Sequence, residues 1–100
     1  MASIRLELLN MLYDSKREQM PINYTSLINT IRRSGLACNI TAINPNVFNV
    51  NHEDQLDPDY YYTQIILRTK NLCFKYVLKS INKNEIVVVY ASTDHNIRRN

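Results

Sequence analysis

Glycine is almost absent from this chain of 100 residues, with Gly35 as its single instance. Glycine-rich phosphate-binding loops need several positions where the backbone takes a positive φ or closely approaches a ligand, so such loops are excluded. Zinc-ligand spacings, serine nucleophile elbows and paired catalytic carboxylates are also missing from the sequence. We therefore expect a protein that is not an enzyme and that uses no metal and no cofactor.

Cysteine and long apolar runs are scarce as well. The two cysteines, Cys38 and Cys73, are far apart and lie in apolar segments. A disulfide between them would need Cα atoms within about 7 Å and an oxidising compartment, so we expect two buried thiols that pack as small apolar side chains. No apolar run approaches the length of a membrane span, and the first residues lack the pattern of a signal peptide. The protein is therefore expected in the cytoplasm, without a membrane partner.

The residues that are present suffice for one globular domain. Apolar residues make up 45% of the sequence, a share typical of a folded chain rather than a disordered one. The expected domain covers residues 1–91, and a polar C-terminal tail covers residues 92–100. Asparagine, isoleucine and tyrosine are frequent, and their codons are rich in A and T, as in the genomes of many phages, viruses and some bacteria. This bias indicates a phage- or virus-type protein.

Two helices are predicted at the start of the chain. Ser3 is placed to cap the first helix, whose apolar residues recur at helical spacing until Pro21 prevents its continuation. The second helix begins near Asn23 or Thr25. Gly35 is placed to end it as a residue in the left-handed conformation.

Alternation of apolar and polar residues predicts strands in the rest of the chain. The predicted strands cover 36–43, 60–69, 72–81 and 85–91, and a short edge strand could form at 47–50. A turn is expected at 44–46 and an acidic loop at 52–59. The fold class is therefore α+β, with two N-terminal helices packed on a three- to four-stranded antiparallel sheet. The alternative is a winged-helix-like fold, with a third helix in place of the strand at 36–43. An uncovered edge strand would allow a homodimer.

Three consecutive tyrosines follow the acidic loop. Because adjacent side chains of a strand point to opposite faces, at least one of the three rings should be exposed. Tyrosine is frequent at interface hot spots, since it supplies a large contact area at a small entropic loss. The leading hypothesis is a non-enzymatic binding protein, an accessory factor or inhibitor acting on a protein partner. Its predicted contact residues are Tyr60, Tyr61, Tyr62, Glu53, Asp54, Asp57 and Asp59.

The same acidic segment could be interpreted as a metal-binding loop with His52, Asp54, Asp57 and Asp59. Calcium loops place oxygen ligands at alternating positions and use a glycine for the sharp bend. This segment contains no glycine and its spacing is irregular. A solvated acidic loop is therefore the prediction.

The alternative function is nucleic-acid binding, which the net charge of +3 permits. Lys75 and Lys79 share one face of their predicted strand, and a basic sheet surface can follow a phosphate backbone. Single-strand binders also place aromatic rings on that face, whereas alternation puts Phe74 and Tyr76 on the face opposite Lys75. The predicted residues of this alternative are Arg68, Lys70, Lys75, Lys79, Lys83, Arg32 and Arg33.

The segment from Phe74 to His95, an apolar β-hairpin followed by a basic end, resembles the terminal hairpin of small RelE-type ribonuclease toxins. In that family, basic, histidine and tyrosine residues act on bound RNA. The resemblance implies a second alternative, a small ribonuclease with His95 as general base beside Asp94. The first strand that such a fold needs ahead of its helices has no counterpart, since a helix is predicted from Ser3 onward.

Overall fold

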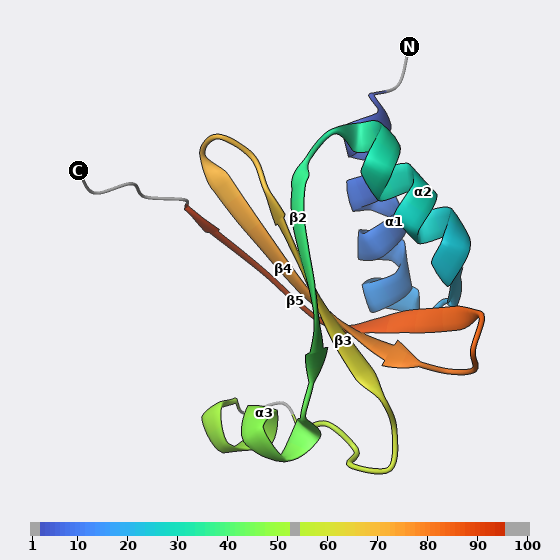
Figure 1. The fold of residues 1–100 in the computed structure, drawn as a ribbon, viewed down its shortest axis with the longest axis vertical. Helices are drawn as coiled ribbons and strands as arrows, with labels where there is room; N and C mark the ends of the chain where they lie inside the picture. The colour runs from blue at the N-terminus through green and yellow to red at the C-terminus, as the bar shows by residue number, and fades with distance from the viewer. Residues whose placement is uncertain (1–2, 53–54, 96–100) are drawn as a thin grey trace.

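Two long helices precede most of the strands of the sheet in the chain (Figure 1). The computed structural model describes residues 3–52 and 55–95. In chain order, the elements are α1 (Ile4–Glu18), β1 (Ile22–Asn23), α2 (Tyr24–Ser34), β2 (Ala37–Ile43), α3 (Pro45–Asn51), β3 (Tyr62–Arg68), β4 (Leu72–Ser80) and β5 (Glu85–His95).

The strands form one antiparallel sheet in the order β1-β5-β4-β3-β2. Helices together with an antiparallel sheet confirm the predicted α+β class. The sheet has five strands rather than three or four, because the two-residue β1 adds to the outer side of β5. The winged-helix-like alternative is wrong, because residues 37–43 pair with β3 over their whole length as a strand.

The ends of α1 and α2 are fixed by local chemistry. The side chain of Ser3 accepts a backbone N–H at the start of α1, and that of Asn23 does so at the start of α2. Gly35 ends α2 in the left-handed conformation with a φ of 70°, as predicted. Gln19 takes the same conformation after α1, with a φ of 53°, so α1 ends before Pro21 is reached.

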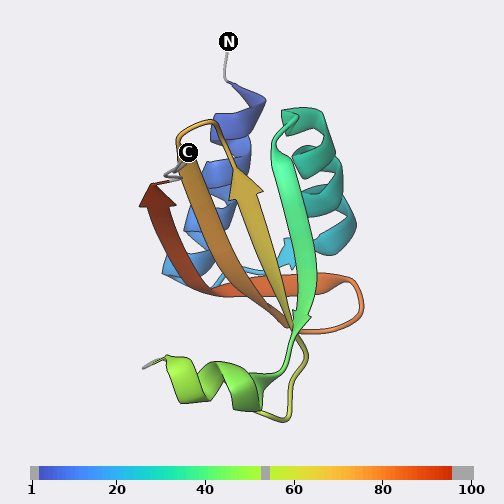
Figure 2. The ribbon, with the colours of Figure 1, turned by 60° about the vertical axis from the view of Figure 1, so that its left-hand side comes forward.

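The helices α1 and α2 cover one face of the sheet, and the main core lies between them and the strands (Figure 2). Leu8 and Leu12 of α1 and Leu27 of α2 are completely buried there. Alternate residues of the strands complete this core, which agrees with the period-two pattern of the sequence. These strand residues are Ile65, Leu67, Tyr76, Leu78, Ile86 and Val88.

The helix α3 occupies residues that the sequence predicted as a turn and a short edge strand. The Asn44 side chain accepts a hydrogen bond from Asn46 N (2.9 Å), and Pro45 takes the first helical position, where its missing N–H removes no helical bond. Phe48 then packs against the sheet on the face that α1 and α2 leave uncovered. It forms a second apolar cluster with Leu56, Tyr62 and Val77.

The last strand is longer than predicted. Ser92 to His95 pair with β4, so four residues of the predicted polar tail belong to the sheet. Their side chains are mostly exposed, which explains why hydrophobic alternation does not reveal them. Residues 96–100 lie outside the described residues.

The two cysteines are free thiols, and both are half-buried rather than buried as predicted. Cys38 packs against the main core, and burial raises the pKa of its thiol above the usual value. Cys73 pairs with Arg68 of β3. Since Cys38 pairs with Leu67, the neighbour of Arg68, the two thiols point to opposite faces of the sheet.

Candidate binding surfaces

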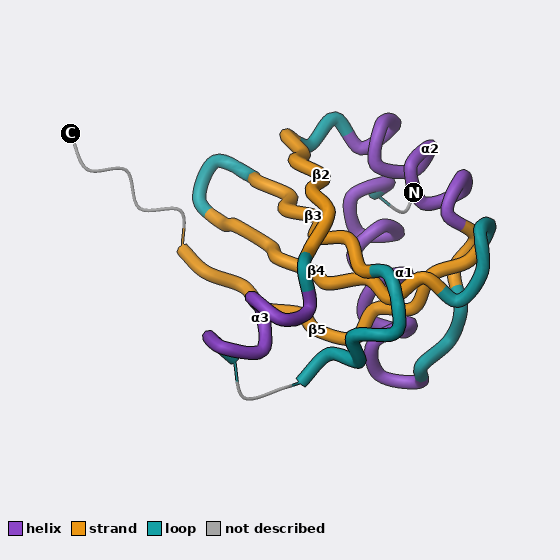
Figure 3. Tube along the Cα trace, turned by 60° about the horizontal axis from the view of Figure 1, so that its bottom comes forward, coloured by secondary structure: helices purple, strands orange, loops and turns teal. Residues whose placement is uncertain are grey.

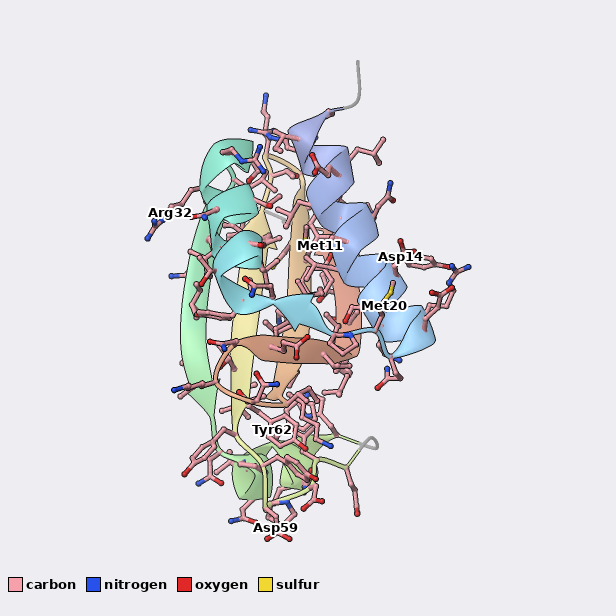
Figure 4. All side chains as sticks on the ribbon, turned by 90° about the vertical axis from the view of Figure 1, so that its right-hand side faces the viewer. Met11, Asp14, Met20, Arg32, Asp59 and Tyr62 are labelled. Carbon is pink, nitrogen blue, oxygen red and sulfur yellow. The ribbon has the colours of Figure 1, made fainter. Side chains whose placement is uncertain are left out.

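Large apolar side chains are exposed at the end of the molecule that carries α3. Val47 and Val50 on α3 are 60% and 83% exposed, and Tyr60 and Tyr61 in the loop before β3 are 43% and 85% exposed. Figure 4 shows this end of the molecule, with Asp59 at its tip, far from α1 and α2. The α3-end surface comprises Val47, Val50, Asp57, Asp59, Tyr60 and Tyr61.

The three tyrosines have different environments. The ring of Tyr62 is buried in the second cluster, and its hydroxyl accepts a hydrogen bond from Asp57 N (3.0 Å). The ring of Tyr60 lies beneath the ammonium group of Lys79, 3.7 Å from its centroid, in a cation–π contact. Tyr61 is almost fully exposed. The prediction that at least one ring is exposed is confirmed by Tyr61. The buried Tyr62 instead contacts the loop through its hydroxyl and stabilises it.

The loop before β3 is fixed to α3 by hydrogen bonds. The Asn49 side-chain amide donates to Leu56 O (2.9 Å), and Leu56 N donates to Asn49 Oδ1 (2.6 Å). Farther along, Asp59 N donates to Asp57 Oδ1 (2.9 Å), and Tyr60 N donates to Asp57 O (3.2 Å). These hydrogen bonds restrain the backbone that carries the α3-end surface, which lowers the entropic cost of docking.

The acidic residues of this end are only partly described. Asp57 and Asp59 are exposed, and the ion pairs found in residues 3–52 and 55–95 all involve Arg17 on α1 instead. Glu53 and Asp54 lie outside the described residues. The same part of the chain contains no group of three or more His, Cys, Asp or Glu residues that could hold a metal ion. The carboxylates of Asp57 and Asp59 give the α3-end surface a negative rim.

A second candidate site is a groove of about 490 Å³ beside α3, on the face of the sheet that α1 and α2 leave uncovered. The rings of Phe48 and His52 stack with their centroids 3.8 Å apart, and the ring of Tyr90 meets both edge-on at 5.6 Å. Because a carbonyl only accepts, His52 Nδ1 donates to Phe48 O (3.0 Å). The sheet groove is lined by Phe48, His52, Gln64, Lys75, Tyr90 and Asp94.

The sheet groove changes the interpretation of the lysine face, which is the face of the sheet that carries Lys75 and Lys79. Phe74 and Tyr76 do lie on the helix-covered side, but aromatic rings from α3 and β5 reach the face of Lys75 as well. Between Lys75 and Lys79, Val77 is almost completely buried beneath α3. This face is therefore partly covered, and it is not the continuous solvated surface that alternation alone predicts.

The predicted basic residues do not form one surface. Figure 3, in which the lower end of Figure 1 comes forward, shows α3 beside the strands, whereas the turn between β3 and β4 lies at the other end of the sheet. Arg68 and Lys70 line a pocket of about 500 Å³ at this other end, together with Arg5, which the sequence pattern did not single out. The remaining residues are spread over the sheet groove (Lys75), the contact with Tyr60 (Lys79), the β4–β5 turn (Lys83) and the last turn of α2 (Arg32 and Arg33).

The residues of the ribonuclease alternative are also separated. Asp94 lines the sheet groove, whereas His95 pairs with Leu72 at the end of β5 and is exposed. The histidine of the groove is His52, which the sequence pattern placed in the acidic loop. Its position depends on α3, a helix that the same pattern did not predict.

Comparison with known proteins gives no relative from which a role could be transferred. No protein-family model matches the chain, and neither a curated protein nor a solved structure matches it significantly. Within the described ranges, no helix has the length and apolar character needed to cross a membrane. A role must therefore be inferred from the surfaces themselves.

Proposed function

We propose that this protein is a non-enzymatic binding protein, an accessory factor or inhibitor of the cytoplasm, which docks its α3-end surface on a protein partner. The observation that carries this proposal is the exposure of Tyr61 (85%) and Val50 (83%) on segments that hydrogen bonds and the second cluster hold in place. Rigid aromatic and aliphatic side chains exposed to water are typical of interface centres.

The charge of the α3-end surface indicates the chemistry of the partner. Asp57 and Asp59 are exposed beside the tyrosines and form no ion pair within the described residues. A complementary protein surface would have an apolar centre and a rim of lysine or arginine. Contacts at such a rim mainly affect the association rate and its dependence on salt, whereas the buried rings mainly affect dissociation.

Site-specific photo-cross-linking tests this proposal even while the partner is unidentified. A photoreactive phenylalanine analogue replaces Tyr61 in cells that naturally contain the protein, and the control carries it at Tyr13, an exposed tyrosine on α1. The expected result is one discrete adduct with a different protein from position 61 and none of that adduct from position 13. Identical adducts from both positions, or an adduct only with a second copy of this chain, would contradict the proposal.

A second candidate function is the binding of single-stranded nucleic acid in the sheet groove. The specific observation in its favour is that the rings of His52 and Tyr90 border the same groove as the Lys75 ammonium. Bases stack on aromatic rings, and a cation attracts the phosphate backbone. This arrangement satisfies the requirement for aromatic rings on the lysine face that the sequence pattern left unmet.

Fluorescence anisotropy of labelled single-stranded RNA, at low and at physiological salt, tests the second candidate. Binding should weaken steeply with salt, and Lys75→Gln should weaken it more than the control Lys83→Gln, which changes a lysine in the β4–β5 turn. Absence of binding at low salt would remove both this candidate and the ribonuclease alternative. Cleavage of the same RNA on a gel would instead favour the ribonuclease.

A further inference from the structure

The two edges of the sheet differ in how far other parts of the chain cover their backbone. At the β5 edge, β1 pairs with Ile86 and Glu85, and α1 reaches the backbone of Val88. Ser15 Oγ accepts from Val88 N (3.0 Å), and Gln19 Nε2 donates to Val88 O (3.3 Å). A bulge also interrupts β5 at this point. Such devices prevent the part of this edge from Glu85 to Val88 from pairing with another chain.

The β2 edge has none of these protections. Its seven residues contain no charge and no proline, and they pair with β3 from Ala37 to Ile43 without a bulge. Most of the strand is exposed, and Ile40 at its midpoint is 46% exposed although it is apolar. Figure 4 shows β2 at the margin of the sheet, with no further strand beside it. Within the described residues, β3 is its only strand partner.

We propose that β2 pairs antiparallel with β2 of a second copy of this chain, with Ile40 on the two-fold axis. In an antiparallel pair about a two-fold axis, each residue lies opposite a residue whose side chain points to the same face of the sheet. Because side chains alternate between the faces along a strand, the numbers of two paired residues are both even or both odd, and their sum is even. With the axis at Ile40, Asn39 faces Thr41, Cys38 faces Ala42 and Ala37 faces Ile43. All of these pairs are uncharged, and the exposed Ile40 packs on its own copy.

Self-complementarity is the reason to choose a second copy over another partner. In an isologous interface one patch must fit itself, and β2 meets this condition at each of its seven positions without like charges in contact. The axis is perpendicular to the sheet, so both pairs of long helices lie on one side and both sheet grooves on the other. The two α3-end surfaces then point to opposite ends, free for the partners of the proposed function.

Cysteine cross-linking tests both the contact and its register. The background variant is Cys38→Ala with Cys73→Ser, which removes the free thiols. Ile40→Cys should then form a covalent dimer under mild oxidation, because directly paired Cα atoms are about 4.5–5.5 Å apart, within disulfide range. Thr41→Cys is the matched control, since in this register its two copies lie about 8 Å apart.

A mixed sample gives the second measurement. Asn39→Cys and Thr41→Cys, each unable to cross-link alone, should form the mixed disulfide when combined. In sedimentation, wild type should be dimeric at high micromolar concentration, and Ile40→Lys should raise the dimer dissociation constant at least about ten-fold, because it places two ammonium groups in contact. A monomeric wild type, or a Thr41→Cys variant that cross-links as efficiently as Ile40→Cys, would overturn the proposal.

Discussion

At the scale of single residues, Ser15 joins α1 to β5 through one buried hydroxyl. It is 1% exposed within α1, and its hydroxyl donates to Met20 O (2.7 Å) while accepting from Val88 N (3.0 Å). One hydroxyl thus satisfies a carbonyl at the end of α1 and a buried amide of β5.

Ser15→Ala should therefore lower the free energy of unfolding by about 1–3 kcal/mol, because it leaves the buried Val88 N–H without an acceptor. Urea denaturation measures the change. Ser26→Ala is the matched control, since it removes the same hydroxyl from an exposed position on α2 and should change stability by less than about 0.5 kcal/mol. Equal effects of the two substitutions would mean that the Ser15 bonds contribute nothing.

Tyr76 should make the protein less stable at high pH. Burial raises the pKa of its hydroxyl to about 12, from an ordinary value of 10.0. The unfolded chain therefore loses this proton at lower pH than the folded chain does. The contribution of Tyr76 is complete below about pH 10 and is lost as the pH rises through about 12, a decrease of at most about 3 kcal/mol.

Denaturation across this pH range, compared with Tyr76→Phe, isolates the contribution. The phenylalanine keeps the ring in the core and removes the ionisable group, so the other tyrosines and lysines titrate equally in both proteins. The wild type should lose stability more steeply than Tyr76→Phe. Parallel curves would show that Tyr76 ionises equally in the folded and unfolded states.

At the scale of elements, α3 is attached to the rest of the fold by a few side chains. Phe48 provides the main apolar contact with Leu56, Tyr62 and Val77. Phe48→Ala should lower the stability of this attachment by about 3 kcal/mol, because it removes most of the apolar contact. The amides of α3 and of residues 55–61 should then exchange with solvent much faster, while those of α1 and α2 stay protected.

Hydrogen exchange measures this local loss, with Val50→Ala as the control on the same helix because Val50 is exposed. The control should leave the exchange of α3 nearly unchanged. An equal loss of protection in α1 and α2 would instead mean that both clusters unfold as one cooperative unit.

The elements that the sequence predicted are those with several turns or a clear alternation. The helices α1 and α2 and the strands β2 to β5 are long enough for apolar periodicity to show. The helix α3 is too short for such periodicity to show. Asn and Pro, the residue types at positions 44 and 45, are as typical of a helix cap and a first helical position as they are of a turn. Nothing local could predict β1, because its two residues are a strand only through their pairing with β5.

At the scale of the whole molecule, the candidate sites differ in how far the sequence predicted them. Alternation predicted that at least one of the three tyrosines is exposed, but it did not single out Tyr61, which lies in the loop before β3 rather than in a strand. The sheet groove could not be predicted, because it forms where α3 brings Phe48 and His52 to Tyr90 of β5. Arg68 and Lys79 were predicted to belong to one basic sheet surface, and the fold separates them along the strands.

The central claim is that the α3-end surface binds a protein partner. Its most direct test uses the partner identified by cross-linking through position 61. Calorimetry measures the Kd of this partner for the wild type, for Tyr61→Ala and for the control Tyr13→Ala, which truncates an exposed tyrosine on α1. We expect Tyr61→Ala to raise Kd about 30-fold or more, as for a hot-spot ring worth about 2 kcal/mol, while Tyr13→Ala leaves Kd nearly unchanged. Equal affinities of wild type and Tyr61→Ala would contradict the claim.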